Sequence, residues 1–401
     1  MPSGGSLDIA LKEAVGSSSR IRLALRQLEE VSWNFDGARS RSGFSAAHFH
    51  PGRFISQLPS ILISLLSSPG ELVVDPFCGS GTTLVEAQRL MRRSVGVDIN
   101  PISVLISKAK TLSISSVEIE ATLDRILTDF TSRSVVINTD APLPPLVQAS
   151  KWYSGSVLPD LKRLFHLIAR YDDPCVRLIG EFCFSAILLG VSRETRHWGY
   201  VCDNTSPKGD PKRSVSEALF ELTRSLLAAY RERDRAIAGS IPFDSLVIQG
   251  RSQALTDYVG ADAVDLIVTS PPYFGVVDYV KSQRLSMEWF GHDIEQHRIQ
   301  EIGARSKRHR RLAVDEFEAD LRNTFQSMYV CLKAGAPCAV VFGASKSRTF
   351  NSDDIVAIAE SVGFCLAGEV ERQISVQRRQ NPSLTTEQVY LFCKPSYDSL
   401  G

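Results

Sequence analysis

The sequence lacks several features that would point to particular classes of protein. No hydrophobic run is long enough for a transmembrane helix, and no signal peptide follows Met1. The 8 cysteines are scattered singly without a Cys-x-x-Cys pair, so neither a zinc site nor a disulfide framework is indicated. The formal net charge is zero, so any surface for nucleic acid must come from local clusters of charge. We therefore expect a cytoplasmic globular protein without a metal centre.

Residues 72–98 predict a strand, a glycine turn, a helix and a second strand. The apolar residues that open this stretch are typical of a fully buried parallel strand, and they end at Asp75. Gly79 and Gly81 then permit a tight turn, at which a ligand can approach bare backbone. On these residues alone, a plain connection between a strand and a helix remains an alternative.

The helix expected at residues 82–90 leaves the N–H groups of its first turn free to face such a ligand. The following strand ends at Asp98, and a carboxylate at this position of a βαβ unit binds ribose hydroxyls. The glycine spacing is not that of a dinucleotide site, and no P-loop lysine is present. These features favour a nucleoside ligand without a pyrophosphate, and S-adenosylmethionine is the obvious candidate.

A second motif, Ser270-Pro271-Pro272-Tyr273, follows an apolar strand expected at residues 264–269. The exocyclic amine of cytosine or adenine is a poor nucleophile, and it needs acceptors that hold its N–H groups. The Ser270 hydroxyl and the Pro271 carbonyl can supply them, because successive prolines hold that carbonyl rigidly. Tyr273 offers a flat face for an extruded base. A turn without function is the alternative.

With Asp-Pro-Phe-Cys-Gly-Ser-Gly-Thr at residues 75–82 and Ser-Pro-Pro-Tyr at 270–273, the chain resembles the S-adenosylmethionine-dependent amino-methyltransferases of DNA. These enzymes make N4-methylcytosine or N6-methyladenine, and the resemblance covers roughly residues 45–111 and 245–395. It implies that the tetrapeptide is catalytic and that the cofactor is bound by Phe54, Asp75, Pro76, Phe77, Gly79, Gly81, Thr82, Asp98, Ile99 and Asn100. His48 and His50 fall in a segment that such enzymes close over the methionine end of the cofactor, although they are equally well explained as loop histidines.

The chain departs from the family pattern at two positions. The acid that usually follows the third strand, where it holds the adenine amine of the cofactor, is missing at Arg251-Ser252, so Asp257 or the main chain would have to replace it. Ser270 stands where adenine-specific relatives more often carry Asp or Asn. The resemblance therefore favours methylation of cytosine N4, with adenine N6 as the nearest alternative.

More distant alternatives are an RNA base methyltransferase and a non-catalytic nucleic-acid-binding module with a decayed site. The resemblance also leaves room for a restriction or defence-system partner, which this chain does not identify.

The pattern of strands and helices predicts an α/β protein with a doubly wound, mostly parallel seven-stranded sheet of the class I methyltransferase type. Its later strands are expected at residues 245–249, 264–269, 338–342, 364–374 and 388–394, and the last two fit an antiparallel pair. Residues 1–111 and 241–401 would form the catalytic domain, and 112–240 a helical insertion that contacts DNA. Both motifs fall at carboxyl ends of strands, where ligands bind such sheets.

Several basic residues are candidates for contact with double-stranded DNA from which a base has been flipped. Arg196 and Trp198 lie in a stretch of the insertion where aromatic and basic residues alternate. Lys281 lies in a helix-bearing loop after the tetrapeptide. The densest basic run then supplies a candidate phosphate clamp of Arg305, Lys307, Arg308, Arg310 and Arg311. A solvated surface is the alternative for this run.

Overall fold

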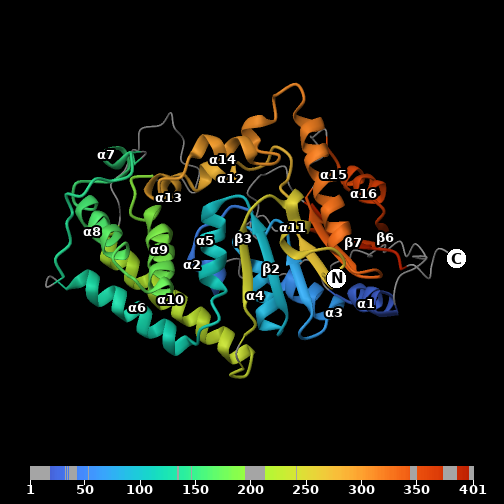
Figure 1. Ribbon diagram of the computed structural model, residues 1–401, viewed down its shortest axis with the longest axis horizontal. Helices are drawn as coiled ribbons and strands as arrows, with labels where there is room; N and C mark the ends of the chain where they lie inside the picture. The colour runs from blue at the N-terminus through green and yellow to red at the C-terminus, as the bar shows by residue number, and fades with distance from the viewer. Residues whose placement is uncertain are drawn as a thin grey trace, which may run out of the picture.

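A computed structural model describes residues 19–31, 33, 35, 43–52, 54–132, 135–145, 147–194, 213–240, 242–343, 350–373 and 386–396. Its centre is one seven-stranded sheet in the order β3-β2-β1-β4-β5-β7-β6 (Figure 1). The strands are β1 (Leu72–Asp75), β2 (Arg93–Asp98), β3 (Ser245–Gln249), β4 (Leu266–Thr269), β5 (Pro337–Phe342), β6 (Cys365–Gln373) and β7 (Thr386–Cys393). Strand β7 is antiparallel to both of its neighbours, and the pairs from β3 to β5 are parallel. The predicted fold class is confirmed.

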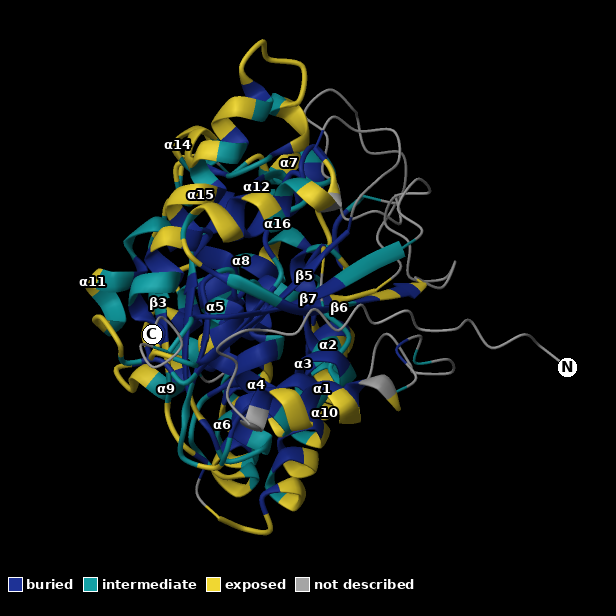
Figure 2. Cartoon of the chain, turned by 90° about the vertical axis from the view of Figure 1, so that its right-hand side faces the viewer, coloured by how far each residue is buried: buried dark blue, intermediate teal, exposed yellow. Residues whose placement is uncertain are grey.

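Helices cover both faces of this sheet, which explains why its central strands are apolar throughout. Every residue of β4 and β5 is buried. One face packs against α1 (Ser19–Glu29), α3 (Gln57–Leu66) and α4 (Thr82–Arg89), and the other against α11 (Leu255–Val259), α15 (Ala313–Cys331) and α16 (Ser352–Ser361). In Figure 2 the middle of the sheet is dark blue, and exposed residues gather on the outer sides of helices such as α14 and α15.

Residues 112–240 contribute a block of helices between α5 (Pro101–Lys110) and β3, on the left in Figure 1. The block contains α6 (Ser116–Thr131), α7 (Ala149–Trp152), α8 (Leu158–Ile168), α9 (Pro174–Leu188) and α10 (Val215–Ala236). A capping box begins α10, since the Glu217 N–H donates to Ser214 Oγ at 3.2 Å and the Ser214 N–H to Glu217 Oε2 at 2.9 Å. The apolar core of the block extends to α5 and to α13 (Arg284–Trp289).

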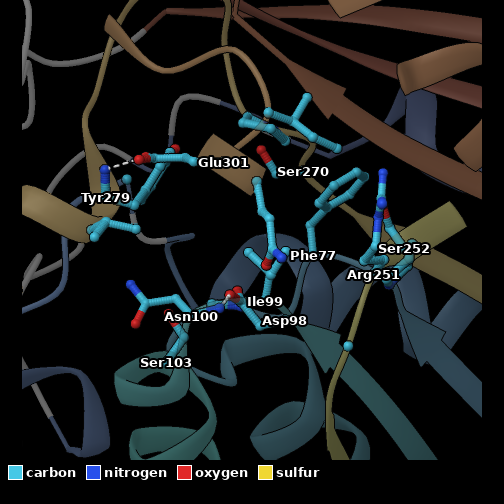
Figure 3. A pocket seen from close by; sticks show the side chains of 18 of the residues that line it. Phe77, Asp98, Ile99, Asn100, Ser103, Arg251, Ser252, Ser270, Tyr279 and Glu301 are labelled. Carbon is cyan, nitrogen blue, oxygen red and sulfur yellow. Dashed lines mark hydrogen bonds between the residues drawn. The ribbon is translucent and has the colours of Figure 1, made fainter. Parts of the chain in front are cut away.

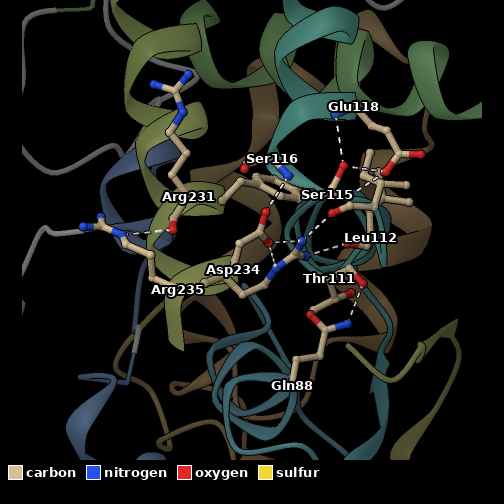
Figure 4. Close-up of polar contacts among 12 residues, drawn as sticks. Gln88, Thr111, Leu112, Ser115, Ser116, Glu118, Arg231, Asp234 and Arg235 are labelled. Atoms are coloured by element: carbon tan, nitrogen blue, oxygen red, sulfur yellow. Dashed lines mark hydrogen bonds and ion pairs between the residues drawn. The ribbon is translucent and has the colours of Figure 1, made fainter. Parts of the chain in front are cut away.

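Polar contacts fasten the end of α10 to the segment that joins α5 and α6 (Figure 4). The guanidinium of Arg233 is buried, and its Nη1 donates to the carbonyl of Leu112 at 2.6 Å. The neighbouring Asp234 accepts the Ser116 N–H at 2.6 Å. Burying charged groups requires such partners. These contacts join the end of α10 to the beginning of the helical block, directly after α5.

The segment between β4 and α15 lies over the carboxyl ends of the strands. It carries α12 (Tyr279–Ser282), α13, α14 (Ile294–Gln300) and a 3-10 turn, η2 (Arg305–Lys307). Two shorter elements complete the description, α2 (Phe44–Ala47) and the 3-10 turn η1 (Ser252–Ala254). Among the described residues, no helix combines the length and the apolar character needed to cross a membrane.

Candidate active site

Two adjoining cavities open at the carboxyl ends of the central strands, and both motifs contribute to their walls (Figure 3). The larger extends from the glycine turn to the segment around Tyr279 and Glu301. Of the predicted residues, it is lined by Pro76, Phe77, Gly79, Asp98, Ile99, Asn100, Ser270 and Pro272. The smaller cavity, of about 310 Å³, is lined by Phe54, Asp75, Phe77, Gly79, Thr82 and Ser270. The structure thus brings together most of the predicted cofactor and catalytic residues.

The turn between β1 and α4 depends on a left-handed glycine. Gly81 has a φ of 76° and precedes the first residue of α4. A Cβ at this position would lie 2.8 Å from Ser107 Oγ and 3.1 Å from Ser107 Cα, so a side chain does not fit. The turn is further held by the Cys78 N–H, which donates to the carbonyl of Val97 at 3.0 Å. Gly81 itself lines neither cavity and acts through the shape of the turn.

Asp98 closes one side of the larger cavity at the end of β2. Its carboxylate accepts the Gly79 N–H at 2.9 Å and the Asn100 N–H at 2.8 Å, one on each oxygen. Burial raises the pKa of Asp98 to about 6, although these hydrogen bonds oppose the shift. Each carboxylate oxygen keeps further lone-pair capacity, which suits the acceptance of two ribose hydroxyls.

Asp75 joins the two motifs directly. The Thr269 hydroxyl at the end of β4 donates to Asp75 Oδ1 at 2.6 Å, and the Phe77 N–H donates to the same oxygen at 3.0 Å. Burial raises the pKa of Asp75 to about 6. This residue therefore sets the distance between the glycine turn and the tetrapeptide, while it also lines the smaller cavity.

The chemistry of the cavity walls fits S-adenosylmethionine. Asn100 uses its side-chain oxygen to accept the Ile102 N–H at 2.9 Å, whereas its buried Nδ2 finds no hydrogen-bond partner in the part of the chain that the structure describes. An orphaned donor in a cavity wall is suited to a polar ligand. Phe77 and Ile99 add apolar surface near Asp98, as an adenosine requires.

The four residues of the tetrapeptide lie in different surroundings. Ser270 lines both cavities and Pro272 only the larger one, whereas Pro271 and Tyr273 line neither. The Tyr273 ring packs edge-on against Phe342, with 5.1 Å between the ring centroids. Its hydroxyl lies 3.3 Å from Ser270 Oγ and donates to Glu387 Oε1 at 3.0 Å. Burial, together with the nearby Glu387 charge, raises the pKa of Tyr273 well above its ordinary value, so the phenol is neutral.

One wall position of the larger cavity was not anticipated from the sequence, and another falls in the segment expected before the cofactor strand. Glu301, which follows α14, lines it and accepts the Tyr279 N–H at 2.5 Å, and burial raises its pKa to about 8. No sequence signal marks this glutamate, because its burial depends on how the segment after β4 folds back. His50 also lines both cavities, and its Nε2 lies 3.0 Å from Ser103 Oγ. Its position agrees with the segment expected before the cofactor strand.

At the position of the missing acid after β3, Arg251 and Ser252 line the larger cavity on the side opposite Tyr279 and Glu301 (Figure 3), and Gln253 also lines it. Asp257 is exposed on α11 and lines neither cavity.

The basic residues predicted to contact DNA fall into distinct environments. Lys307 turns inward, and its ammonium donates to the carbonyls of Ile299 and Glu301, both at 2.7 Å. Arg310 is exposed but pairs with Glu316 at 2.8 Å. The remaining members of the basic run, Arg305, Arg308 and Arg311, are exposed, and Lys281 is half-buried on α12. Arg196 and Trp198 lie outside the described residues.

No group of three or more His, Cys, Asp or Glu side chains that could hold a metal ion occurs within the described ranges.

Comparisons with known proteins agree with this site. Residues 18–109 match the family model N6_N4_Mtase, described as DNA methylase. The Type II methyltransferase M.MjaII of Methanocaldococcus jannaschii is 21% identical over 423 residues, which cover 84% of this chain and 78% of the relative. The Type II methyltransferase M.MvaI of Kocuria varians is 25% identical over 259 residues, which cover 60% of this chain and 56% of the relative.

Among solved structures, the rRNA methyltransferase aviRa from Streptomyces viridochromogenes matches 86% of this chain and 88% of its own, with 12% identity and a TM-score of 0.37. This likeness is weak, and the strand order remains the evidence for the fold. The sequence comparisons thus make the chain similar to a DNA methylase model over residues 18–109 and to Type II methyltransferases over a larger part of its length, as the resemblance carried by the two motifs leads us to expect.

Proposed function

We propose that the protein transfers a methyl group from S-adenosylmethionine to the N4 amine of a cytosine flipped out of double-stranded DNA. The observation that carries the proposal is the position of Ser270, which lines both cavities. A group at the junction of a nucleoside-sized cavity and a second, smaller one can meet the reacting methyl and the attacking amine together. Such alignment supplies much of the rate in a reaction between two bound molecules.

Different residues would bind the cofactor and hold the target base. Asp98 would hold the ribose, and Phe77 and Ile99 the adenine ring, while the turn at Gly79 and the wall at Asp75 would take the methionine end. When bound, the cofactor supplies an electrophilic methyl group on a sulfonium. Ser270 would accept an N–H of the target amine, which favours a pyramidal nitrogen with an available lone pair. The Pro271 carbonyl would accept the second N–H, and the Tyr273 ring would support the flipped base.

The preference for cytosine rests on the side chain of Ser270, since adenine-specific relatives more often carry Asp or Asn at this position. A hydroxyl is shorter than either of those groups. Its oxygen can still accept an N–H of the target amine.

On the DNA side, the exposed guanidinium groups of Arg305, Arg308 and Arg311 support contact with phosphates. Lys281, on α12, would approach the target strand next to the base. Residues 112–240 are proposed as the target-recognition region, because this helical block packs against α13 in the segment that follows the tetrapeptide. The rest of the chain would form the catalytic domain.

The test is methylation of unmethylated duplex DNA and of transfer RNA, offered together with labelled S-adenosylmethionine, followed by digestion and mass spectrometry of the nucleosides. We expect label in N4-methylcytosine from DNA. Ser270→Ala should lower the single-turnover rate with little change in cofactor affinity, because the hydroxyl matters most as the nitrogen pyramidalises. Ser225→Ala, an exposed serine on α10, is the matched control.

Label in N6-methyladenine would replace cytosine by adenine as the target and leave the class of reaction intact. Label confined to transfer RNA would overturn DNA as the substrate. If Ser270→Ala methylated at the rate of the unaltered protein, the tetrapeptide would lose its catalytic role.

A further inference from the structure

A chain of hydrogen bonds links the tetrapeptide to the opposite end of the sequence. The Ser270 hydroxyl contacts the Tyr273 hydroxyl at 3.3 Å, and the Tyr273 hydroxyl contacts Glu387 Oε1 at 3.0 Å. Glu387 lies on β7, and its other oxygen accepts from Arg372 Nη1 at 2.6 Å. Arg372 lies on β6 directly opposite Glu387 and is buried. None of the predicted cofactor contacts takes part in this chain.

The direction of these hydrogen bonds follows from the chemistry of the groups. An ionised carboxylate has no hydrogen to donate, so Tyr273 must direct its single hydrogen to Glu387. The oxygen of Tyr273 is then available only as an acceptor toward Ser270, which must direct its own hydrogen to Tyr273. The lone pairs of Ser270 are left to face the cavities that this residue lines. The raised pKa of Tyr273 agrees with a neutral phenol that keeps its hydrogen.

We propose that Glu387 is a positioning residue, which acts through Tyr273 to fix the Ser270 hydroxyl as a hydrogen-bond acceptor for the target amine. This inference rests on the proposed function. An amine approaching Ser270 brings N–H groups, and a serine hydrogen turned into the cavity would oppose it. The ion pair with the buried Arg372 holds the carboxylate of Glu387 in place and balances its charge.

Glu387→Gln tests the direction of these hydrogen bonds, because it changes the shape of the side chain very little. The guanidinium of Arg372 can only donate, so the amide would turn its oxygen to Arg372 and its NH₂ group to Tyr273. Tyr273 would then donate to Ser270, and the Ser270 hydrogen would point into the cavity. We expect the single-turnover rate of methylation to fall about tenfold or more, as when a transition-state hydrogen bond is lost. The dissociation constants for S-adenosylmethionine and DNA should stay unchanged.

Tyr273→Phe interrupts the series of hydrogen bonds at a second point, because it removes the hydroxyl. It keeps the ring packed against Phe342 and any stacking of the ring on the base. We expect a fall similar to that in Glu387→Gln. The double variant should be no slower than the slower single variant, because the two residues act in one chain. The matched control is Glu371→Gln, at an exposed residue next to Arg372 on β6 that accepts from Gln388 at 2.9 Å. It should methylate normally.

Unaltered rates in Glu387→Gln or in Tyr273→Phe would overturn the inference, as would a double variant whose loss equals the product of the two single losses. A structural role alone would weaken cofactor binding together with the rate, and that result would also overturn it. If the unaltered protein methylates no exocyclic amine, the proposed function fails first. Normal methylation by the unaltered protein and by both single variants would refute the inference alone.

Discussion

The glycine turn and Asp98 of the cofactor half are held mainly by residues close together in the sequence, with Thr269 on Asp75 as a distant contact, whereas Tyr273 of the base half depends on a residue far away. Asp98 accepts hydrogen bonds from Gly79 and Asn100, and Asp75 accepts one from Phe77. By contrast, Tyr273 depends on Glu387 of β7. The nearest partner of Asp98 is 2 residues away, and Glu387 is 114 residues from Tyr273.

This difference suggests how each half responds to change. A cofactor site built from a turn and adjacent N–H groups tolerates alteration elsewhere, but a single substitution in the turn distorts all of it. The base half has its groups distributed over several elements, so its parts can be altered one at a time. The predictions below compare the two halves in order of expected effect.

The largest effect is expected at Gly81, in the turn of the cofactor half. Gly81→Ala places a side chain at a φ of 76° and against Ser107. Left-handed backbone costs a residue with a Cβ about 1–2 kcal/mol, and overpacking adds about 1–3 kcal/mol. The free energy of unfolding, measured by chemical denaturation, should fall by the sum of the two. Cofactor affinity should fall with it.

Gly70→Ala is the control that separates these two costs. Gly70 has a similar φ of 84°, yet a Cβ there would meet nothing within 4 Å. In Gly70→Ala the free energy of unfolding should therefore fall only by the smaller cost of the left-handed backbone, and cofactor binding should be normal. Equal losses in both variants would show that the contact with Ser107 relaxes freely, and that the turn is less rigid than its hydrogen bonds indicate.

A second effect is expected at Asp98. Asp98→Ala removes a charged acceptor for the ribose, and a hydrogen bond to a charged group contributes roughly 1.5–3 kcal/mol. The affinity for S-adenosylmethionine, measured by calorimetry, should fall by about tenfold or more. Asp257→Ala, an exposed aspartate on α11 that lines neither cavity, should bind normally. Unchanged binding in Asp98→Ala would remove this residue from the cofactor site.

The same difference between near and distant contacts explains what the sequence could predict. Strands β1 and β4 could be located because apolar runs end in recognisable motifs, and the glycine turn carries its own signal. Glu301 and Glu387 could not, since each is an ordinary glutamate until the chain brings it to Tyr279 or Tyr273. The basic run was visible in sequence, but the inward turn of Lys307 was not, because its acceptors are two carbonyls without any sequence signature.

A third prediction concerns pH and tests Glu301 in the wall of the larger cavity. The pKa of Glu301 is raised by burial to about 8, so the native protein holds this proton more tightly than the unfolded chain does. The resulting stability is present at low pH and is lost as the pH rises toward 8. Without cofactor, the free energy of unfolding should be lower at pH 8 than at pH 6 by on the order of 1–2 kcal/mol from this group.

Glu301→Gln should remove that part of the pH dependence, and a smaller part should remain. The remainder comes from Glu86, whose pKa burial raises to about 7, and from Asp75 and Asp98 at about 6. Glu295→Gln, an exposed residue of α14, should leave the pH dependence as it is. An unaltered pH dependence in Glu301→Gln would mean that the buried carboxyl is already ionised at neutral pH.

The smallest effects are expected from single basic residues on the DNA side of the base half. Each phosphate contact contributes about 0.9 to the slope of log affinity against log salt concentration. Arg308→Gln and Arg311→Gln should each flatten that slope by up to about this amount, because both guanidinium groups are exposed. Lys307→Met should leave the slope unchanged, since its ammonium is engaged by two backbone carbonyls. Titrations of a DNA duplex at several salt concentrations measure all three. If Lys307→Met flattens the slope as much as the arginine variants do, the lysine leaves its carbonyls when DNA binds, and the segment after α14 rearranges on the DNA.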